Sequence, residues 1–495
     1  MASTGDLILA WRAPRWHATR MRNILALVAL LLSNAANAAP APADVRIAET
    51  LRDRALAESG AFQIVESLTT EVGQRLAGSP AEARARDWAV AKMKALGFRN
   101  VHVEPFTIQG WERGAETAEV VAPVPQRLAI TALGHSGATP AAGLDAEIVA
   151  FTSMAAFREA TAEQVRGKIV FITHRMAATQ DGSSYGAFNA IRSRAPAMAS
   201  RLGAAAIVIR SLGTDSHRLP HTGTTIWNAG GPRPPGGRAQ DGVSATPIPA
   251  AAMSVPDSEL LERLLAMGKP VRLHLVLTPR FTGTVQSGNV IGEIPGTQRP
   301  DEIVLLGGHL DSWDLGQGAI DDGTGIAVSF AAAKLIADHG PARRTIRVVA
   351  WGSEETGLEG GVAYAKAHAT DKHILAAEDD FGTGRVWKLD TRVAPGALPT
   401  IDAMARVLLP LGIPRGDNNS GYESDLGPLA PTGMPVLGFA QDGTGYFALH
   451  HTADDTLDKV DAKALDQTAA AFAAMMWMAA NTDERFGPAA PETAR

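Results

Sequence analysis

The amino-acid sequence predicts an α/β protein in which a mostly parallel sheet lies between layers of helices. Two observations favour this fold class. Several short runs, such as 302–307 (EIVLLG) and 345–351 (TIRVVAW), are apolar on both faces, as strands are when helices cover both sides of their sheet. Segments with helical periodicity alternate with these runs. Ligands of such sheets bind just beyond the carboxyl ends of the strands, so the residues that follow each strand are candidates for function.

The first part of the chain after the N-terminus is expected to be helical. Apolar residues recur at helical spacing through 46–98, and a second helix over 80–96 is ended by Gly97. A strand is expected at 101–106. We assign 39–114 to the N-terminal part of the main domain.

The middle of the chain has a different pattern of apolar residues. Short strands are expected, for example at 168–173 and 204–209, and there is little helical periodicity. Proline and glycine crowd 230–237 (GGPRPPGG), which predicts an irregular loop. The block 115–277 is therefore expected to be an inserted, β-rich domain.

After residue 277 the alternation of strands and helices becomes regular, and 278–495 is expected to form the main part of the α/β domain. Strands are predicted at 290–294, 302–307, 345–351, 374–377 and 435–439. Helices are predicted at 325–339, 360–368 and 462–480.

Length and composition narrow the class of protein. A chain of 495 residues is too long for one simple core and suggests two domains with additional segments. The formal net charge of -6 provides no basic surface for nucleic acid, which is not expected as a partner. Cysteine is absent, which excludes disulfides, thiolate zinc sites and cysteine nucleophiles. Histidine and carboxylates remain as metal ligands.

The N-terminus has the pattern of an export signal. Arginines precede the apolar run 24–32, and 36–38 (ANA) offers a small-residue cleavage site, so 1–38 is predicted to be a signal peptide. The run is too short to span a bilayer, and no stable membrane span is expected. Met21 is an alternative start, and a buried N-terminal helix is the alternative to a signal. The predicted location is secreted or periplasmic.

Acids and histidines follow the predicted core strands. Each has an ordinary explanation when taken alone: His309 and Asp311 as a surface loop, Asp321 as a helix cap, Glu354 and Glu355 as a solvated turn. Capping and solubility do not explain why several core strands are all followed by such residues. We therefore predict a metal site on one rim of the sheet. Its candidate residues are His309, Asp321, Glu354, Glu355, Asp380 and His451.

The number of candidates suits two zinc ions. One bridging carboxylate, with one histidine and one terminal carboxylate for each ion, gives five ligands and leaves positions open for water. Two ions about 3.5–4 Å apart would activate a shared water, and the sixth residue would act as the base. Imidazole ligands favour Zn²⁺ or Co²⁺ over calcium.

Five motifs occur in a recognisable order. They are 308–314 (GHLDSWD), 316–323 (GQGAIDDG), 354–355 (EE), 380–383 (DFGT) and 450–456 (HHTADDT). In this order they resemble the zinc-dependent aminopeptidase and carboxypeptidase family with two co-catalytic ions. The resemblance covers most of the chain that follows the predicted signal peptide. Two further segments, 207–210 (IVIR) and 220–223 (PHTG), resemble an inserted domain found in part of that family.

The resemblance implies the zinc exopeptidase fold and a role for each ligand. Asp321 would bridge two zinc ions. His309 and Asp380 would complete one site, and Glu355 and His451 the other.

The resemblance also implies residues that act beside the metals. Glu354 would be the general base. Asp311 would fix the tautomer of His309, next to a cis Asp311–Ser312 peptide bond. Within the adjacent pairs of acids and histidines, the family pattern favours Asp380, which precedes Phe-Gly-Thr, and the histidine that stands four residues before an aspartate.

The implied function is that of a secreted dizinc exopeptidase acting on dipeptides or short peptides by metal-activated water. The block 115–277 would be a protease-associated domain that covers the active site or forms a homodimer surface. Two alternatives belong to other classes: a catalytically inactive receptor or binding protein, and a single-zinc acyltransferase of the glutaminyl cyclase type. The complete set of six positions argues against both. The sequence does not distinguish aminopeptidase, dipeptidase and carboxypeptidase action.

Overall fold

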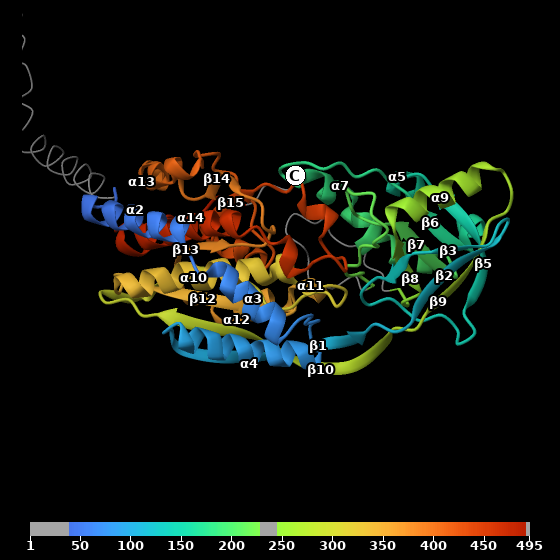
Figure 1. Cartoon of the computed structure of the whole chain (residues 1–495), viewed down its shortest axis with the longest axis horizontal. Coiled ribbons are helices and arrows are strands. Elements are labelled where there is room, and N and C mark those ends of the chain that lie inside the picture. Colours follow the sequence, from blue (N-terminus) through green and yellow to red (C-terminus); the bar gives the residue numbers. More distant parts are fainter. Residues whose placement is uncertain (1–38, 228–244, 492–495) are drawn as a thin grey trace, which may run out of the picture.

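The computed structural model describes residues 39–227 and 245–491 and places two sheets side by side (Figure 1). The predicted signal peptide 1–38 and the predicted loop 230–237 lie outside the described residues. Within the described residues, no helix combines the length and apolar character needed to cross a membrane.

The first sheet has seven strands, and its four central strands are parallel. In spatial order the strands are β1 (Arg99–Glu112), β10 (Arg280–Ile294), β12 (Arg344–Trp351), β11 (Arg299–His309), β13 (Lys372–Glu378), β15 (Val436–Gln441) and β14 (Val386–Arg392). The strands at both edges pair antiparallel. The predicted α/β class is confirmed, with the parallel pairing confined to the centre of the sheet.

Helices and irregular segments cover both faces of this sheet. Successive residues of β11 alternate between the faces: Val304 and Leu306 belong to one buried cluster, and Ile303 and Leu305 to another. This is why the run is apolar throughout. The first face is covered by α2 (Pro42–Ala57), α3 (Ala61–Glu71), α4 (Pro80–Ala95), α10 (Thr324–His339) and α14 (Ala462–Asn481). The second face is covered by α12 (Glu359–Ala367) and residues 422–434.

The second sheet has eight strands, all within residues 116–277. Its spatial order is β3 (Gln126–Leu128), β2 (Glu116–Ala122), β9 (Arg272–Leu277), β5 (Leu144–Phe151), β6 (Ile169–Ile172), β7 (Ala206–Arg210), β8 (Ala250–Met253) and β4 (Ile130–Ala132). More helix accompanies it than the sequence predicted. These helices are α5 (Met154–Arg158), α6 (Ala162–Val165), α7 (Ser183–Ser193), α8 (Ala195–Arg201) and α9 (Val255–Ala266).

A two-stranded ribbon connects the two sheets. β1 and β10 pair antiparallel along most of their length, β2 starts shortly after β1 ends, and β9 ends shortly before β10 starts. In Figure 1 the ribbon runs from the first sheet towards the second. We refer to the part of the molecule around the second sheet, residues 115–277, as the second lobe.

The remaining elements are short. They are a π-type turn at Ala319–Gly323, α11 (Glu354–Gly357), α13 (Leu398–Ala405) and 3₁₀ turns at Pro395–Ala397, Arg406–Leu411, Gly427–Thr432, Tyr446–Ala448 and Leu457–Lys459.

Candidate active site

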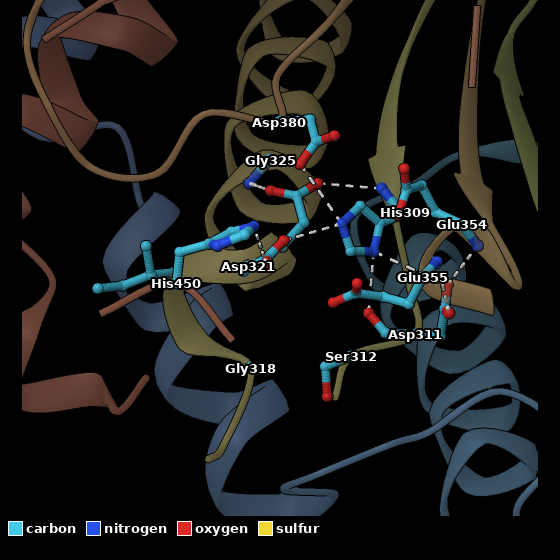
Figure 2. A network of polar contacts seen from close by, with 12 residues as sticks. His309, Asp311, Ser312, Gly318, Asp321, Gly325, Glu354, Glu355, Asp380 and His450 are labelled. Atoms are coloured by element: carbon cyan, nitrogen blue, oxygen red, sulfur yellow. Dashed lines mark hydrogen bonds and ion pairs between the residues drawn. The ribbon is translucent and has the colours of Figure 1, made fainter. Parts of the chain in front are cut away.

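The carboxyl ends of three parallel strands meet at one rim of the seven-stranded sheet. His309 is the last residue of β11, Glu354 and Glu355 begin α11 shortly after β12, and Asp380 follows β13. Parallel pairing puts these strand ends at the same edge. Figure 2 shows the side chains of these residues gathered there.

Asp321 lies between two histidines. Its Oδ1 is 3.1 Å from Nε2 of His309, and its Oδ2 is 3.2 Å from Nε2 of His451. The residue sits in the π-type turn that leads into α10. One carboxylate therefore presents each of its oxygens to a different imidazole.

Each histidine also faces a second carboxylate. Nε2 of His309 is 3.4 Å from Oδ1 of Asp380, and Nε2 of His451 is 3.0 Å from Oε2 of Glu355. Two clusters result, which share Asp321 between them. We call His309, Asp321 and Asp380 the first cluster, and His451, Asp321 and Glu355 the second cluster.

The residues of both clusters fit a metal ion. Asp321 Oδ2 and Glu355 Oε1 are buried and have no hydrogen-bond partner among the described residues. Burying such oxygens without a partner is costly, and a cation would supply one. Imidazole nitrogens with carboxylate oxygens are the donor set that zinc prefers when thiolates are absent.

Two neighbours, Asp322 and His450, also lie close enough to take part in a metal site. Asp322 is already occupied: its Oδ2 accepts the backbone N–H of His309 at 3.0 Å, and its Oδ1 accepts that of Gly325 at 2.8 Å. Asp322 therefore holds the first turn of α10 through its bond to Gly325. Nε2 of His450 is 3.7 Å from Asp321, farther than that of His451.

Asp311 organises the site in two ways. Nδ1 of His309 lies 3.0 Å from the backbone carbonyl oxygen of Asp311 and 3.7 Å from its carboxylate. The carbonyl is thus the nearer acceptor for an Nδ1–H, which leaves Nε2 free for a metal. The Asp311 carboxylate accepts the backbone N–H groups of Glu354 at 3.0 Å and of Glu355 at 3.3 Å.

The prediction of a cis peptide bond at Asp311–Ser312 is wrong. Within the described residues the one cis bond that does not precede proline is Asp321–Asp322. The isomer of a peptide bond depends on the tertiary contacts of both residues, which a motif carried over from a family does not record.

The charges of the site perturb its titration. Burial opposes the charged imidazole of His309, but Asp380 and Asp321 outweigh it and hold its pKa well above the usual value. Burial likewise opposes charge on His451, yet Glu355 and Asp321 raise its pKa to about 9. For Asp321, the neighbouring imidazoles of His309 and His451 outweigh burial, and its pKa lies well below the usual range.

Burial is the main cause of the raised pKa values of Asp311, Glu354 and Glu355. It raises the pKa of Asp311 to about 7 and that of Glu355 above its usual value. Burial also raises the pKa of Glu354 well above its usual value; His309 opposes this shift, and the carboxylates of Asp380 and Glu355 reinforce it. A buried carboxylate with a raised pKa binds a proton more readily than an exposed one.

Two supporting residues were not predicted from the sequence. Asp455 accepts the backbone N–H of Ile320 at 2.6 Å and that of Asp321 at 3.3 Å, so it holds the turn that carries Asp321. Arg75 is fully buried and donates at 2.8 Å to the carbonyl oxygens of Gln317 and Gly318. Asp455 belongs to the motif at 450–456, whereas the sequence around Arg75 carries no signal of this role.

A cavity of about 660 Å³ lies over both clusters. The part of the molecule around the first sheet contributes the site residues, including Glu354, and the second lobe contributes residues of α7 and residues 224–227. A volume of this size accommodates a ligand as large as a short peptide.

Asp379 and Asp380 are expected to respond differently to the same substitution. Burial and neighbouring acids raise the pKa of Asp379 well above its usual value, which favours the neutral carboxyl, and an amide resembles that form. Asp379→Asn should keep its metal content and activity, whereas Asp380→Asn should lose metal from the first cluster and most activity. Elemental analysis and turnover of the two purified variants check this. Equal metal loss in both would contradict the assignment of Asp380.

Comparisons with known proteins identify the family to which the chain belongs. Residues 289–476 match the sequence profile of peptidase family M28. Carboxypeptidase Q of Mus musculus is 31% identical over 430 residues, which cover 86% of this chain and 87% of that protein. Carboxypeptidase Q of Homo sapiens is 32% identical over 431 residues, with the same coverage. The motifs predicted this resemblance, and it is confirmed.

Solved structures agree as well. A peptidase M28 precursor from Shewanella amazonensis SB2B is 44% identical, with a TM-score of 0.86 over 90% of this chain and 99% of that one. The aminopeptidase from Aneurinibacillus sp. strain AM-1 is 21% identical with a TM-score of 0.59 and shares the fold. The chain therefore belongs to peptidase family M28 and is a metallopeptidase.

Proposed function

We propose that the protein is a secreted dizinc exopeptidase that hydrolyses the peptide bonds of dipeptides or short peptides. The observation that carries the proposal is the position of Asp321, whose two oxygens face two clusters of the same composition. One histidine and one further carboxylate stand on each side of it. This is the arrangement expected of a bridging ligand between two ions.

The two clusters assign the ligands. His309 and Asp380 would hold one zinc ion, His451 and Glu355 would hold the other, and Asp321 would hold both. When bound, the ions activate water for attack and polarise the carbonyl of the scissile bond.

Glu354 is the carboxylate left for proton transfer. It lines the cavity beside Glu355 and belongs to neither cluster. The backbone N–H of Glu354 donates to the Asp311 carboxylate, and this bond fixes the position of the Glu354 backbone. The Glu354 carboxylate takes the proton of the attacking water and returns it to the nitrogen of the leaving amine. A covalent enzyme intermediate is not required.

The organisation of the chain belongs to the same proposal. The signal peptide 1–38 would direct export to the periplasm or beyond, and 39–114 with 278–495 would form the peptidase domain. The inserted domain 115–277 would be of the protease-associated type, and its contribution of α7 to the cavity wall supports a role in covering the active site. The outer surface of this domain would be the contact surface of a homodimer, if one forms.

A metal count combined with a substrate panel tests the proposal. We expect about two zinc ions per chain by elemental analysis, loss of activity on chelation, and recovery when zinc is added back. Free dipeptides with apolar, acidic and basic side chains should be cleaved, and N-blocked and C-blocked versions identify which terminus is needed. A count near one zinc would instead favour the single-zinc acyltransferase class, and turnover that survives complete chelation would contradict the mechanism.

A further inference from the structure

We propose that the second lobe is a structural part of the second cluster. Its residues His221 and Thr222 hold the turn that carries His451, and they thereby set the affinity for the ion bound there. The inference rests on the proposed dizinc function and assigns His221 and Thr222 as positioning residues. It follows from hydrogen bonds between two segments that lie far apart in the sequence.

The second lobe binds the backbone of the turn that carries His451. Nδ1 of His221 lies 2.8 Å from the carbonyl oxygen of His450. That oxygen can only accept, so Nδ1 carries the proton and donates it. The backbone N–H of Thr222 donates to the carbonyl oxygen of His451 at 3.0 Å. Two successive carbonyl oxygens of the turn are therefore bound by two successive residues of the second lobe.

A third contact extends this pairing towards the start of the turn. The backbone N–H of Thr214 donates to the carbonyl oxygen of Phe447 at 3.2 Å. The three donors thus belong to one segment, 214–222, and the three acceptors to another, 447–451. Because water does not reach buried backbone groups, each of them depends on such a partner.

The same segment of the second lobe also receives the ring of His451. Nε2 of His451 faces Asp321 and Glu355, so a metal held there leaves the ring proton on Nδ1. The carbonyl oxygen of Thr222 lies 3.3 Å from Nδ1 and can accept that proton. Arg192 approaches Nδ1 at 3.0 Å, but a guanidinium can only donate. Thr222 is therefore the acceptor that fixes the tautomer in which Nε2 is free for a metal.

The backbone of His451 has a conformation that needs support from its surroundings. Its φ is 61°, in the left-handed region that residues with a side chain rarely adopt. Such a conformation persists only where neighbouring groups determine it. The bonds from His221 and Thr222 lie on either side of the peptide unit that joins His450 to His451, so they are placed to hold it.

His221 and Thr222 are themselves fixed within the second lobe. The backbone N–H of His221 donates to Oγ of Ser211 at 2.9 Å, and Oγ1 of Thr222 donates to the carbonyl oxygen of Ala132 at 2.8 Å. Both residues are buried. A Cβ atom at Gly213 would lie 2.2 Å from Nε2 of His221, so glycine leaves the room that this ring occupies. The lobe therefore presents both donors in a defined position.

The other two ligands of the second cluster are held from the opposite side. Asp455 accepts the backbone N–H of Asp321, and Asp311 accepts that of Glu355. All four of these residues belong to the part of the molecule around the first sheet. A change at His221 should therefore displace one ligand of the second cluster and leave the first cluster as it is.

Zinc titrations in variants that keep one cluster test the proposal. His309→Ala removes a ligand of the first cluster, so the ion that remains reports on the second. Competition with a zinc chelator compares His309→Ala with the same variant carrying His221→Ala. We expect the added change to lower the zinc affinity about 10- to 100-fold, the range for a group that orients a metal ligand. In His451→Ala, which keeps the first cluster, the same addition should leave the affinity unchanged.

His174→Ala is the matched control. His174 is also buried in the second lobe, its Nε2 lies 3.1 Å from the carbonyl oxygen of Arg210, and it does not line the cavity. This variant should lose stability but keep its zinc affinity. His221→Asn should regain most of the affinity, because its amide N–H can donate to the carbonyl oxygen of His450. An equal loss of affinity in His174→Ala, or no recovery with asparagine, overturns the proposal.

Cobalt supplies a spectroscopic readout of the same site. With Co²⁺ bound to His309→Ala, the visible absorption should shift when His221→Ala is added and stay the same when His174→Ala is added. Unchanged affinity and absorption in a folded protein overturn the inference while the peptidase function stands. If His221→Ala does not fold, Gly213→Ala displaces the same ring and replaces it in each measurement. A wild type with no more zinc than His451→Ala overturns the proposed dizinc function itself.

Discussion

Replacing Glu354 with glutamine should lower kcat by about a thousandfold, within the range of a lost general base, while both zinc ions remain bound. The amide keeps the size of the side chain but cannot accept a proton from water. Metal binding should survive because neither cluster includes Glu354. Steady-state kinetics and elemental analysis of the purified variant measure the two effects separately.

Glu359→Gln is the matched control for this experiment. Glu359 lies in α12 close to Glu354, accepts a hydrogen bond from Ser353 at 2.8 Å, and does not line the cavity. Burial raises its pKa, so glutamine resembles its neutral form. We expect this variant to retain most of its turnover. Wild-type turnover in Glu354→Gln would show that another group accepts the proton.

Replacing Asp321 with alanine should remove both zinc ions and abolish activity. The carboxylate serves the first and the second cluster at once, so its loss deprives each ion of a ligand. By contrast, His309→Ala removes a ligand from the first cluster only and should leave close to one zinc per chain. Elemental analysis after gel filtration in metal-free buffer distinguishes the two outcomes.

Asp458→Ala controls for the loss of a nearby acid. Asp458 is exposed and follows the motif that contains His451. It should keep two ions and full activity. If Asp321→Ala also retained two zinc ions, the carboxylate would not be a shared ligand, and two independent sites would have to be considered.

The strands of the first sheet could be predicted because a buried parallel strand is apolar at every position. β11, β12 and β13 were located within a few residues, and the residues that follow them reach the same rim for a topological reason. The meeting of His309, Glu355 and Asp380 at this rim could therefore be predicted without knowing the paths of the loops.

The rest depended on long-range contacts that leave little trace in the sequence. His451 reaches Asp321 from a segment well beyond β15, and the order of motifs, rather than periodicity, pointed to it. Arg75 donates to backbone carbonyl oxygens, which every residue has. The sequence therefore contains no particular residue type that would reveal the partners of Arg75. The helices of the second lobe are short, and α7 in particular offers few apolar positions for a periodic signal.

The contact between the Glu354 backbone and the Asp311 carboxylate could not be predicted from the sequence either. A carboxylate that accepts two backbone N–H groups looks the same in sequence as one that pairs with an imidazole. Only the path of the chain after β12 decides between them.

The β1–β10 ribbon joins the part of the molecule that carries the predicted metal ligands to the part that carries α7. Proton transfer and metal binding are assigned to one side of the cavity, and α7 forms part of the other side. Substitutions along the cavity side of α7 should therefore change which substrates fit, without altering the residues that cut the bond.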